Sequence, residues 1–320
     1  MKLSCSETVQ DTSPRIQLYQ DIKSFYSYVE AQNGFSAHTV QALLLIALYE
    51  MGHGIYPAAY LTVGNAARLG YAMGIHSPKA PQMLPPCTTW TEQEERRRIS
   101  WGIVILDRFL FIGNRGKVLA TADPGLEVHL PTDDEAWDRG EMLVAAPLLL
   151  STSPSTRVSA FARTCQAAHL LGKVVRHIDD SSLPPEHRFA DAMQLQRTLR
   201  AFADVLTVEV LEPSTALTSS TSMAITLSAL LSLYDAYSCT ARLPVTGTED
   251  QLTMQKASID GLKQMSDRAV QFLRQVRIAA SESQLGRMSF MVVDCVYQTA
   301  ANCTYSHACP ALGGLPSALY

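Results

Sequence analysis

The sequence predicts an all-α protein, a multi-helical array of roughly eight to ten helices with a long proline-rich loop near its centre. Apolar residues recur at intervals of three and four over most of the chain, which is the period of one face of a helix. Alternation of apolar and polar residues, which is typical of half-buried strands, is missing apart from residues 117–119, which could be extended. Helices packed on helices are therefore the expected architecture.

Two helices are predicted first, around residues 40–51 and 57–72. The expected buried face of the first consists of Val40, Leu43, Leu44, Leu48 and Met51. Gly52 and Gly54 are expected to end it. Pro57 suits the first turn of the second helix, where no N–H donor is needed. The expected face of the second helix consists of Ala58, Leu61, Asn65, Leu69 and Ala72, followed by Gly74 as a cap.

A longer, charged helix follows an exposed loop. Residues 77–89 contain four prolines and are predicted to form that loop. Thr91 and Glu94 have the spacing of a capping box, which predicts a helix from there to about Phe111. The expected buried face of this helix consists of Ile99, Ile103, Leu106 and Leu110.

The charged helix carries a run of three basic residues, Arg96, Arg97 and Arg98. Such a run could contact phosphates in a DNA-binding protein. However, Glu92 and Glu94 precede Arg96 and Arg98 by four residues, which is the favourable order for ion pairs on a helix. We therefore interpret this segment as a salt-bridged helix.

The central segment, residues 114–155, has no regular period and contains four prolines, which predicts a long loop that packs on the domain or carries function. The second half is again helical. Its apolar stripes lie within residues 161–175, 195–206, 223–237, 262–276 and 285–303. We expect a flexible N-terminus at residues 1–18 and a flexible tail at residues 310–320.

The composition excludes several classes of function. The chain of 320 residues has 26 basic and 30 acidic side chains, a net charge of −4 and a pI near 6.1, so these residues are not expected to bind DNA by themselves. The seven cysteines are odd in number and form no C-x-x-C pair, which argues against a zinc site or a disulfide framework. A signal-peptide core is missing, and the longest apolar run is far shorter than the ~20 residues of a membrane span, so an intracellular protein without membrane contact is expected.

One acidic cluster offers an enzymatic alternative. Asp134, Glu135 and Asp138 form a D-E-x-x-D pattern, which all-α terpene synthases use to bind magnesium and a diphosphate. Those enzymes need the pattern on a helix facing the cavity, whereas here it follows Leu130 and Pro131 in the predicted loop, and no second metal-binding segment occurs downstream. We therefore favour a solvated turn and helix start, where acids suit the helix dipole, and assign no catalytic, cofactor-binding or metal-binding residue.

The stretch from residue 39 to residue 131 resembles the regulatory, or middle homology, domain of fungal zinc-cluster transcription factors. The resemblance rests on Thr39–Leu45 (TVQALLL), on Leu69–His76 (LGYAMGIH), on Glu94–Arg108 with its E-x-R-R-R-x-x-W start and Asp-Arg end, and on His129-Leu130-Pro131. In the loop between the last two, the chain has Asn114-Arg115-Gly116-Lys117 where the family has Gly-Arg-Pro. The resemblance covers about residues 19–141, as a partial domain, with residues 142–309 as a helical region packed on it.

The resemblance implies a role for each motif residue. The residues that it marks as structural are Arg96, Arg97, Arg98, Trp101, Asp107, Arg108, Arg115 and Pro131. Trp101 is expected to pack inside the domain. Asp107 and Arg108 are expected to tie the end of the charged helix to the loop at residues 114–131.

The resemblance also implies a function, that of a transcription regulator in the nucleus, with a secondary-metabolite gene cluster as its expected target. The implied partners are the transcription machinery or co-regulator proteins, a small-molecule effector and a second copy in a homodimer. Zinc and DNA are implied only for an N-terminal six-cysteine cluster, which this sequence does not contain. The alternatives that stay open are the magnesium-dependent enzyme and a generic helical interaction scaffold.

Overall fold

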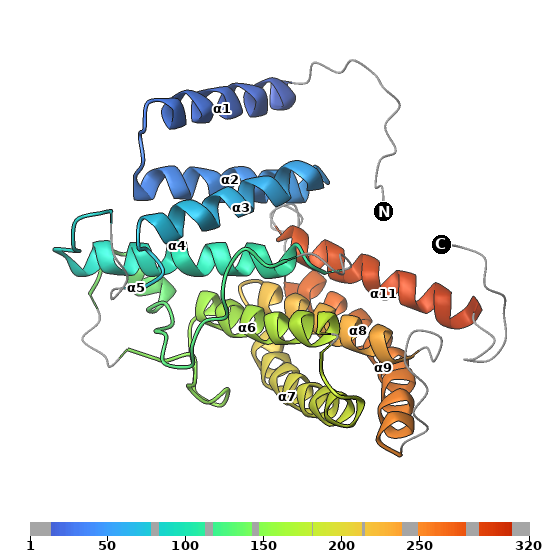
Figure 1. Ribbon diagram of the computed structural model, residues 1–320. Coiled ribbons are helices and arrows are strands. Elements are labelled where there is room, and N and C mark those ends of the chain that lie inside the picture. The colour runs from blue at the N-terminus through green and yellow to red at the C-terminus, as the bar shows by residue number, and fades with distance from the viewer. Residues whose placement is uncertain are drawn as a thin grey trace. The chain divides into compact units, whose positions relative to one another are not determined.

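The computed structural model describes residues 14–77, 83–112, 118–142, 147–180, 182–212, 215–238, 249–279 and 288–308. These residues form ten helices and no strand (Figure 1), which confirms the predicted all-α class. Within them, extended pairing is limited to one isolated bridge between His129 and Leu149. No described helix combines the length and the apolar composition that crossing a lipid bilayer requires.

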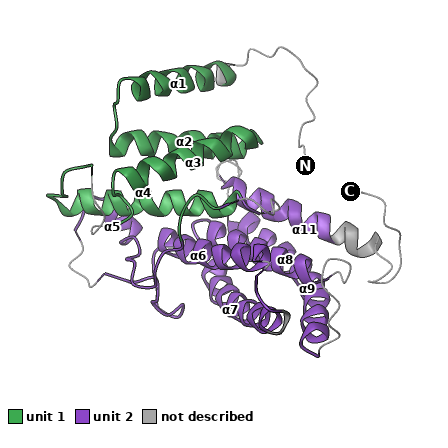
Figure 2. Ribbon diagram, viewed as in Figure 1, with its two compact units in different colours: residues 1–110, 119–122 green, residues 111–118, 123–320 purple. Residues whose placement is uncertain are grey.

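The chain divides into two compact units, residues 1–110 with 119–122 and residues 111–118 with 123–320 (Figure 2). The helices of the first unit are α1 (Pro14–Ala31), α2 (Ala37–Gly52), α3 (Tyr56–Ala72) and α4 (Trp90–Phe109). Those of the second are α5 (Asp134–Asp138), α6 (Ala160–Asp179), α7 (Pro185–Leu211), α8 (Ser220–Ser238), α9 (Glu249–Ala279) and α11 (Phe290–Ala308).

The predicted domain limits are sequence-based and stay predictions. Of the N-terminus expected to be flexible, residues 1–13 lie outside the described residues, whereas residues 14–18 form the start of α1. Pro14 fits there because the first turn of a helix needs no N–H donor. The tail at residues 310–320 also lies outside the described residues.

The core of the first unit lies between α2, α3 and α4. Its members are Tyr26, Val40, Leu43, Ile46, Ala66, Ala67, Met73, Ile75, Ile99 and Ile103. Two glycines let the helices approach closely. A Cβ on Gly70 would lie 2.9 Å from Ile103 Cδ1, and a Cβ on Gly102 would lie 3.0 Å from Leu44 Cδ1. A larger residue at either position would therefore force the end of the Ile103 or Leu44 side chain to shift.

The predicted faces of α2 and α3 are partly wrong. Leu48, Leu61 and Ala72 were expected to be buried but are exposed, while Glu50 and Thr62 are buried. Both helices have apolar residues on more than one side, so the period alone does not determine which side faces the core. Glu50 and Thr62 can lie inside because Tyr19 and Lys23 on α1 form hydrogen bonds with them.

The capping box of α4 forms two residues earlier than predicted. The helix begins at Trp90, so Thr89 is the N-cap and its hydroxyl accepts a hydrogen bond from the Glu92 N–H at 3.1 Å. Glu92 Oε2 accepts in turn from the N–H groups of Thr88 and Thr89, and the Thr88 bond is the largest cause that lowers the pKa of Glu92. Glu94, the predicted partner, is instead buried against two arginines.

The second unit is built around α8. This helix packs against α6, α7, α9 and α11, and its residues from Met223 to Leu231 are all buried. Gly261 on α9 allows close contact, because a Cβ there would lie 2.5 Å from the ring of Tyr234. The predicted buried stripes of α8 and α9 are confirmed, whereas Leu285 in the last predicted stripe lies outside the described residues.

Candidate functional site

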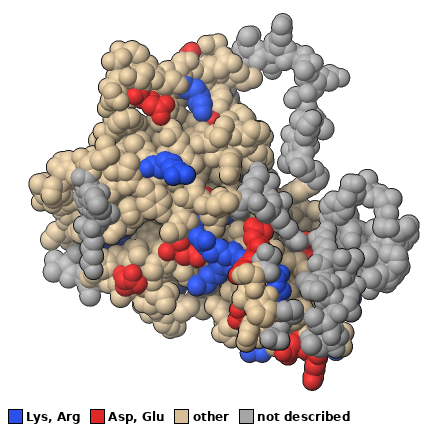
Figure 3. All heavy atoms as spheres, viewed as in Figure 1, with Lys and Arg blue, Asp and Glu red and all other residues tan. Residues whose placement is uncertain are grey.

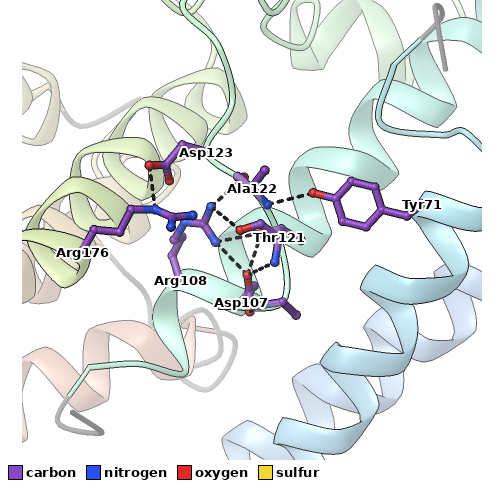
Figure 4. Close-up of polar contacts among 8 residues, drawn as sticks. Tyr71, Asp107, Arg108, Thr121, Ala122, Asp123 and Arg176 are labelled. Carbon is purple, nitrogen blue, oxygen red and sulfur yellow. Dashed lines mark hydrogen bonds and ion pairs between the residues drawn. The ribbon is translucent and has the colours of Figure 1, made fainter. Parts of the chain in front are cut away.

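The end of α4 and the segment at residues 119–122 form a densely hydrogen-bonded polar site in the first unit (Figure 4). It is centred on Asp107 and Arg108, which are 2% and 0% exposed. An Asp-Arg pair buried this deeply stabilises a fold only when hydrogen bonds satisfy both groups.

Asp107 holds the backbone of the segment. Its Oδ1 accepts a hydrogen bond from Ala120 N–H at 3.0 Å. Its Oδ2 accepts from the N–H of Thr121 at 2.9 Å and from the Thr121 hydroxyl at 2.6 Å. The same oxygen lies 2.7 Å from Arg108 Nη1. One carboxylate thus receives four hydrogen-bond donors, which compensate for its burial.

Arg108 binds the same segment from its other side. Nη1 donates to the Thr121 hydroxyl at 2.8 Å, and Nη2 donates to the carbonyl oxygens of Thr121 and Ala122 at 3.2 and 2.8 Å. The Ala122 N–H donates to the hydroxyl of Tyr71 on α3 at 2.8 Å. The planar fork of the guanidinium reaches two carbonyls and a hydroxyl at once, which a lysine ammonium could not do in this geometry.

The remaining motif residues occupy different environments. Trp101 is 2% exposed, and Pro131 is buried in the second unit. Arg115 lies outside the described residues.

The basic triplet makes its contacts within the first unit. Arg97 and Arg98 both bind the fully buried carboxylate of Glu94, Arg98 through Nε at 3.0 Å, so the predicted pair of Glu94 and Arg98 forms. Arg96 donates to the Pro85 carbonyl oxygen at 2.7 Å. Beside them, Gln41 on α2 donates to Glu95 at 2.7 Å. Arg96 thus holds Pro85 against α4, and the other two arginines compensate the buried charge of Glu94.

The acidic cluster at residues 133–138 caps helices. Asp133 is the N-cap of α5 and accepts from Ala136 N–H at 3.0 Å. Asp134 Oδ2 accepts from Phe161 N–H at 2.9 Å in the first turn of α6, where a negative charge is favourable. Among the described residues, no three His, Cys, Asp or Glu side chains come together in a way that could hold a metal ion.

Sequence reasoning missed a polar cluster under α1. The Tyr19 hydroxyl and the Lys23 ammonium donate to Glu50 Oε1 at 2.7 and 3.0 Å, and Lys23 also lies 3.3 Å from Thr62 Oγ1. Burial, followed by the hydrogen bond to Glu50, raises the pKa of Tyr19 to about 12. A glutamate within the apolar run of α2 was the available signal, because buried charges need partners.

Two polar sites in the second unit were also missed. Arg163, 1% exposed on α6, reaches Glu209 on α7 with two nitrogens at 2.7 and 2.8 Å and donates to the Thr156 carbonyl at 2.9 Å. Asp123 accepts from Arg176 on α6 at 2.7 Å (Figure 4). The sequence signal for the Arg163–Glu209 pair was an arginine within an otherwise apolar stripe of α6.

Comparison with known proteins agrees with the family resemblance inferred from the motifs. Transcription factor BOA15 of Botryotinia fuckeliana is 40% identical over 98 residues, which are 31% of this chain and 55% of that protein. The citrinin biosynthesis transcriptional activator mrl3 of Monascus ruber is 27% identical over 173 residues, 52% of this chain and 34% of that protein. The pigment biosynthesis transcriptional activator pigB of Monascus ruber is 30% identical over 137 residues, 40% of this chain and 24% of that protein.

The chain thus spans between about a quarter and about half of the length of these relatives. No solved structure matches it. The fungal specific transcription factor domain matches residues 3–202, which is more than half of the sequence and reaches beyond the segment at residues 19–141 that carries the motifs. This protein therefore belongs to the fungal specific transcription factor domain family.

Proposed function

We propose that this chain is the regulatory domain of a fungal transcription regulator that acts in the nucleus on a secondary-metabolite gene cluster. The observation that carries the proposal is the family match over residues 3–202. Relatives named as activators of citrinin and pigment biosynthesis support the assignment to secondary metabolism.

The proposal assigns DNA recognition to a module other than these residues. The net charge is −4, and on the face shown in Figure 3 the basic side chains lie among acidic ones instead of forming a continuous basic area. The arginines at 96, 97 and 98 bind Pro85 and Glu94 within their own unit. Affinity for DNA depends mainly on neutralised phosphates, and these residues offer little for that.

In this proposal the domain works through protein contacts, with co-regulators or the transcription machinery as partners and a small-molecule effector as a regulator. The Asp107–Arg108 site has a positioning role, because it holds residues 120–122 on the end of α4. Disturbing the site should therefore alter regulation through the fold of the first unit.

A reporter assay tests the proposal. The chain is fused to a heterologous DNA-binding domain, and reporter output in a fungal host is compared with that of the DNA-binding domain alone. We expect a change in output that Arg108→Ala abolishes and that Arg139→Ala, a change at an exposed arginine, retains. Unchanged output combined with purely cytosolic residence would contradict the proposal.

The enzymatic alternative has its own decisive result. If the purified chain turned over a prenyl diphosphate with magnesium, and Asp134→Ala abolished this turnover, the proposed function would be overturned. The structure instead uses Asp134 to cap α6.

A further inference from the structure

Helix α1 lies at the edge of the first unit and buries little of its own surface (Figure 2). Among residues 16–31, eleven side chains are exposed and Tyr26 alone is buried. By contrast, α2, α3 and α4 bury seven, six and ten residues. Tertiary packing of an apolar face is the main source of helix stability in a folded protein, so α1 is held less firmly than its three neighbours.

Polar bonds provide much of the attachment of α1 to α2 and α3. Tyr19 and Lys23 donate to Glu50 on α2, and Asn65 on α3 donates to the Tyr26 hydroxyl at 3.1 Å. The rings of Tyr19 and Tyr26 add an apolar contact with the core of the unit. Hydrogen bonds and ion pairs near the surface contribute little net free energy, because water replaces them when the helix leaves.

Glu50 makes the attachment costly. Its side chain is fully buried, so its charge must be compensated inside the protein. Both bonds from α1 go to Oε1, whereas Oε2 has no hydrogen-bond partner among the described residues. The counter-ion, Lys23, is itself 38% exposed. The carboxylate is thus incompletely satisfied while α1 is attached, and release of α1 would return it to water.

The connection between α1 and α2, residues 32–36, is suited to a hinge. Asn33 has a positive φ of 56°, and Gly34 follows it. The Thr39 hydroxyl donates to the Gly34 carbonyl oxygen at 2.7 Å, so this part of the connection is fixed to α2. A few residues in such a connection can absorb the dihedral changes of a helix that leaves its place.

We propose that α1 is a releasable cover of the first unit, and that the ion pair of Lys23 with Glu50 sets how often it opens. Opening uncovers Glu50, Thr62 and Asn65 while α2, α3 and α4 stay folded, as in a local unfolding unit. The released segment loses helical structure, since an isolated helix of this length is marginal in water. The proposal concerns the folded chain itself and does not rest on its role in transcription.

Two variants separate the effect of the charge from that of packing. Lys23→Met keeps an unbranched side chain but removes the ammonium, so Glu50 stays buried without a counter-ion while α1 is attached. The released form hydrates the same carboxylate, so release becomes easier. The double variant Lys23→Met with Glu50→Gln buries no charge, and the introduced amide can still accept from the Tyr19 hydroxyl. Attachment should therefore be recovered in the double variant.

Amide hydrogen exchange of the whole chain, read by mass spectrometry from milliseconds to hours, tests the proposal. In wild type, peptides from α1 are expected to exchange at least about tenfold faster than those from α2. Lys23→Met should speed exchange in α1 by a further tenfold or more, roughly, without changing α2. The double variant should exchange more slowly in α1 than Lys23→Met does. Lys256→Met, at an exposed lysine on α9, removes the same charge elsewhere and should leave α1 unchanged.

Several results would overturn the proposal. Equal protection of α1 and α2 in wild type would show that α1 opens only together with the whole unit. An α1 rate that Lys23→Met does not change, or a double variant that opens as readily as the single one, would show that the buried charge does not govern opening. If Lys23→Met speeds exchange in α2, α3 and α4 as much as in α1, the helix is an integral part of the core and no separate cover exists.

Discussion

Arg108 shows how one buried side chain organises a loop. Its guanidinium binds a carboxylate, a hydroxyl and two carbonyl oxygens, and it is fully buried. A buried charge of this kind is costly to form and more costly to disrupt, because removal of one partner leaves the other uncompensated. The Asp-Arg dipeptide at the end of the motif is therefore a structural requirement of this helix end.

We predict that Arg108→Ala lowers the free energy of unfolding by about 3–5 kcal/mol, the usual loss when one partner of a buried pair is removed. Arg108→Lys should also be clearly destabilising, since one ammonium cannot replace the fork. Urea denaturation followed by circular dichroism measures both. Arg139→Ala is the control. The Arg139 side chain is 55% exposed in a surface ion pair, so this change should alter stability by less than ~1 kcal/mol. A wild-type midpoint for Arg108→Lys would contradict the role assigned to the fork.

His177 is the second residue with consequences for stability. Its Nε2 lies 2.6 Å from the Tyr237 hydroxyl inside the second unit, and the ring of Phe189 packs edge-on against Tyr237. Burial first, and then the charge of Arg188, lower the pKa of His177, while Asp191 and Asp180 oppose this shift. The folded protein therefore takes up this proton less readily than the unfolded chain does.

The sign of the pH effect follows from this lowered pKa. As the pH falls below about 6.5, the ordinary pKa of histidine, the unfolded chain binds the proton first, so the folded state loses stability. We predict that His177→Gln flattens the fall in unfolding free energy between about pH 7 and pH 5. His187→Gln, at an exposed histidine on α7, should leave the slope unchanged. Urea midpoints across this pH range measure it, and equal slopes for wild type and His177→Gln would refute the assignment.

At the scale of the elements, the start of α4 shows which of two possible capping boxes the helix forms. The S/T-x-x-E spacing occurs at Thr89 with Glu92 and at Thr91 with Glu94, and the structure uses the first. Glu94 cannot cap the helix because Arg97 and Arg98 hold it in the interior. The local spacing is compatible with both capping boxes. Only the first one forms, because Glu94 is held in a buried ion pair.

We predict that Thr89→Ala lowers the free energy of unfolding by about 1 kcal/mol, since an unsatisfied N–H group would remain at the helix start. Thr91→Ala should cost less than about 0.5 kcal/mol, because Thr91 is exposed on the first turn. Chemical denaturation of the two variants compares them directly. A larger loss for Thr91→Ala would show that the helix begins two residues later.

The faces of α2 and α3 show a limit of periodicity. The sequence identified both helices and their glycine ends, and Gly54 and Gly74 indeed have positive φ angles of 70° and 72°. It did not identify which side is buried, because leucines lie all round α2 and a polar cluster from α1 covers Glu50 and Thr62. A neighbouring helix, and not the helix itself, decides that choice.

At the scale of the whole molecule, charge governs what the chain can bind. With 26 basic against 30 acidic side chains, we predict no measurable binding to duplex DNA at ~0.15 M salt. Fluorescence anisotropy with labelled duplexes measures this, and the fusion to a heterologous DNA-binding domain is the positive control on its own site. Binding tighter than ~1 µM that weakens steeply with added salt would contradict the prediction.

The sequence by itself determined the helical class, the family motifs and the positions of most helices, because these depend on periods and caps within a few residues of one another. It also placed Asp107 and Arg108 next to each other. Only the tertiary structure decided that Arg108 binds the carbonyl oxygens of residues 121 and 122, that Asp134 caps a helix beginning 26 residues later, and that α1 keeps its leucine and phenylalanine outside. Such contacts join residues far apart in the chain, and local patterns carry no information about which distant partner will be near.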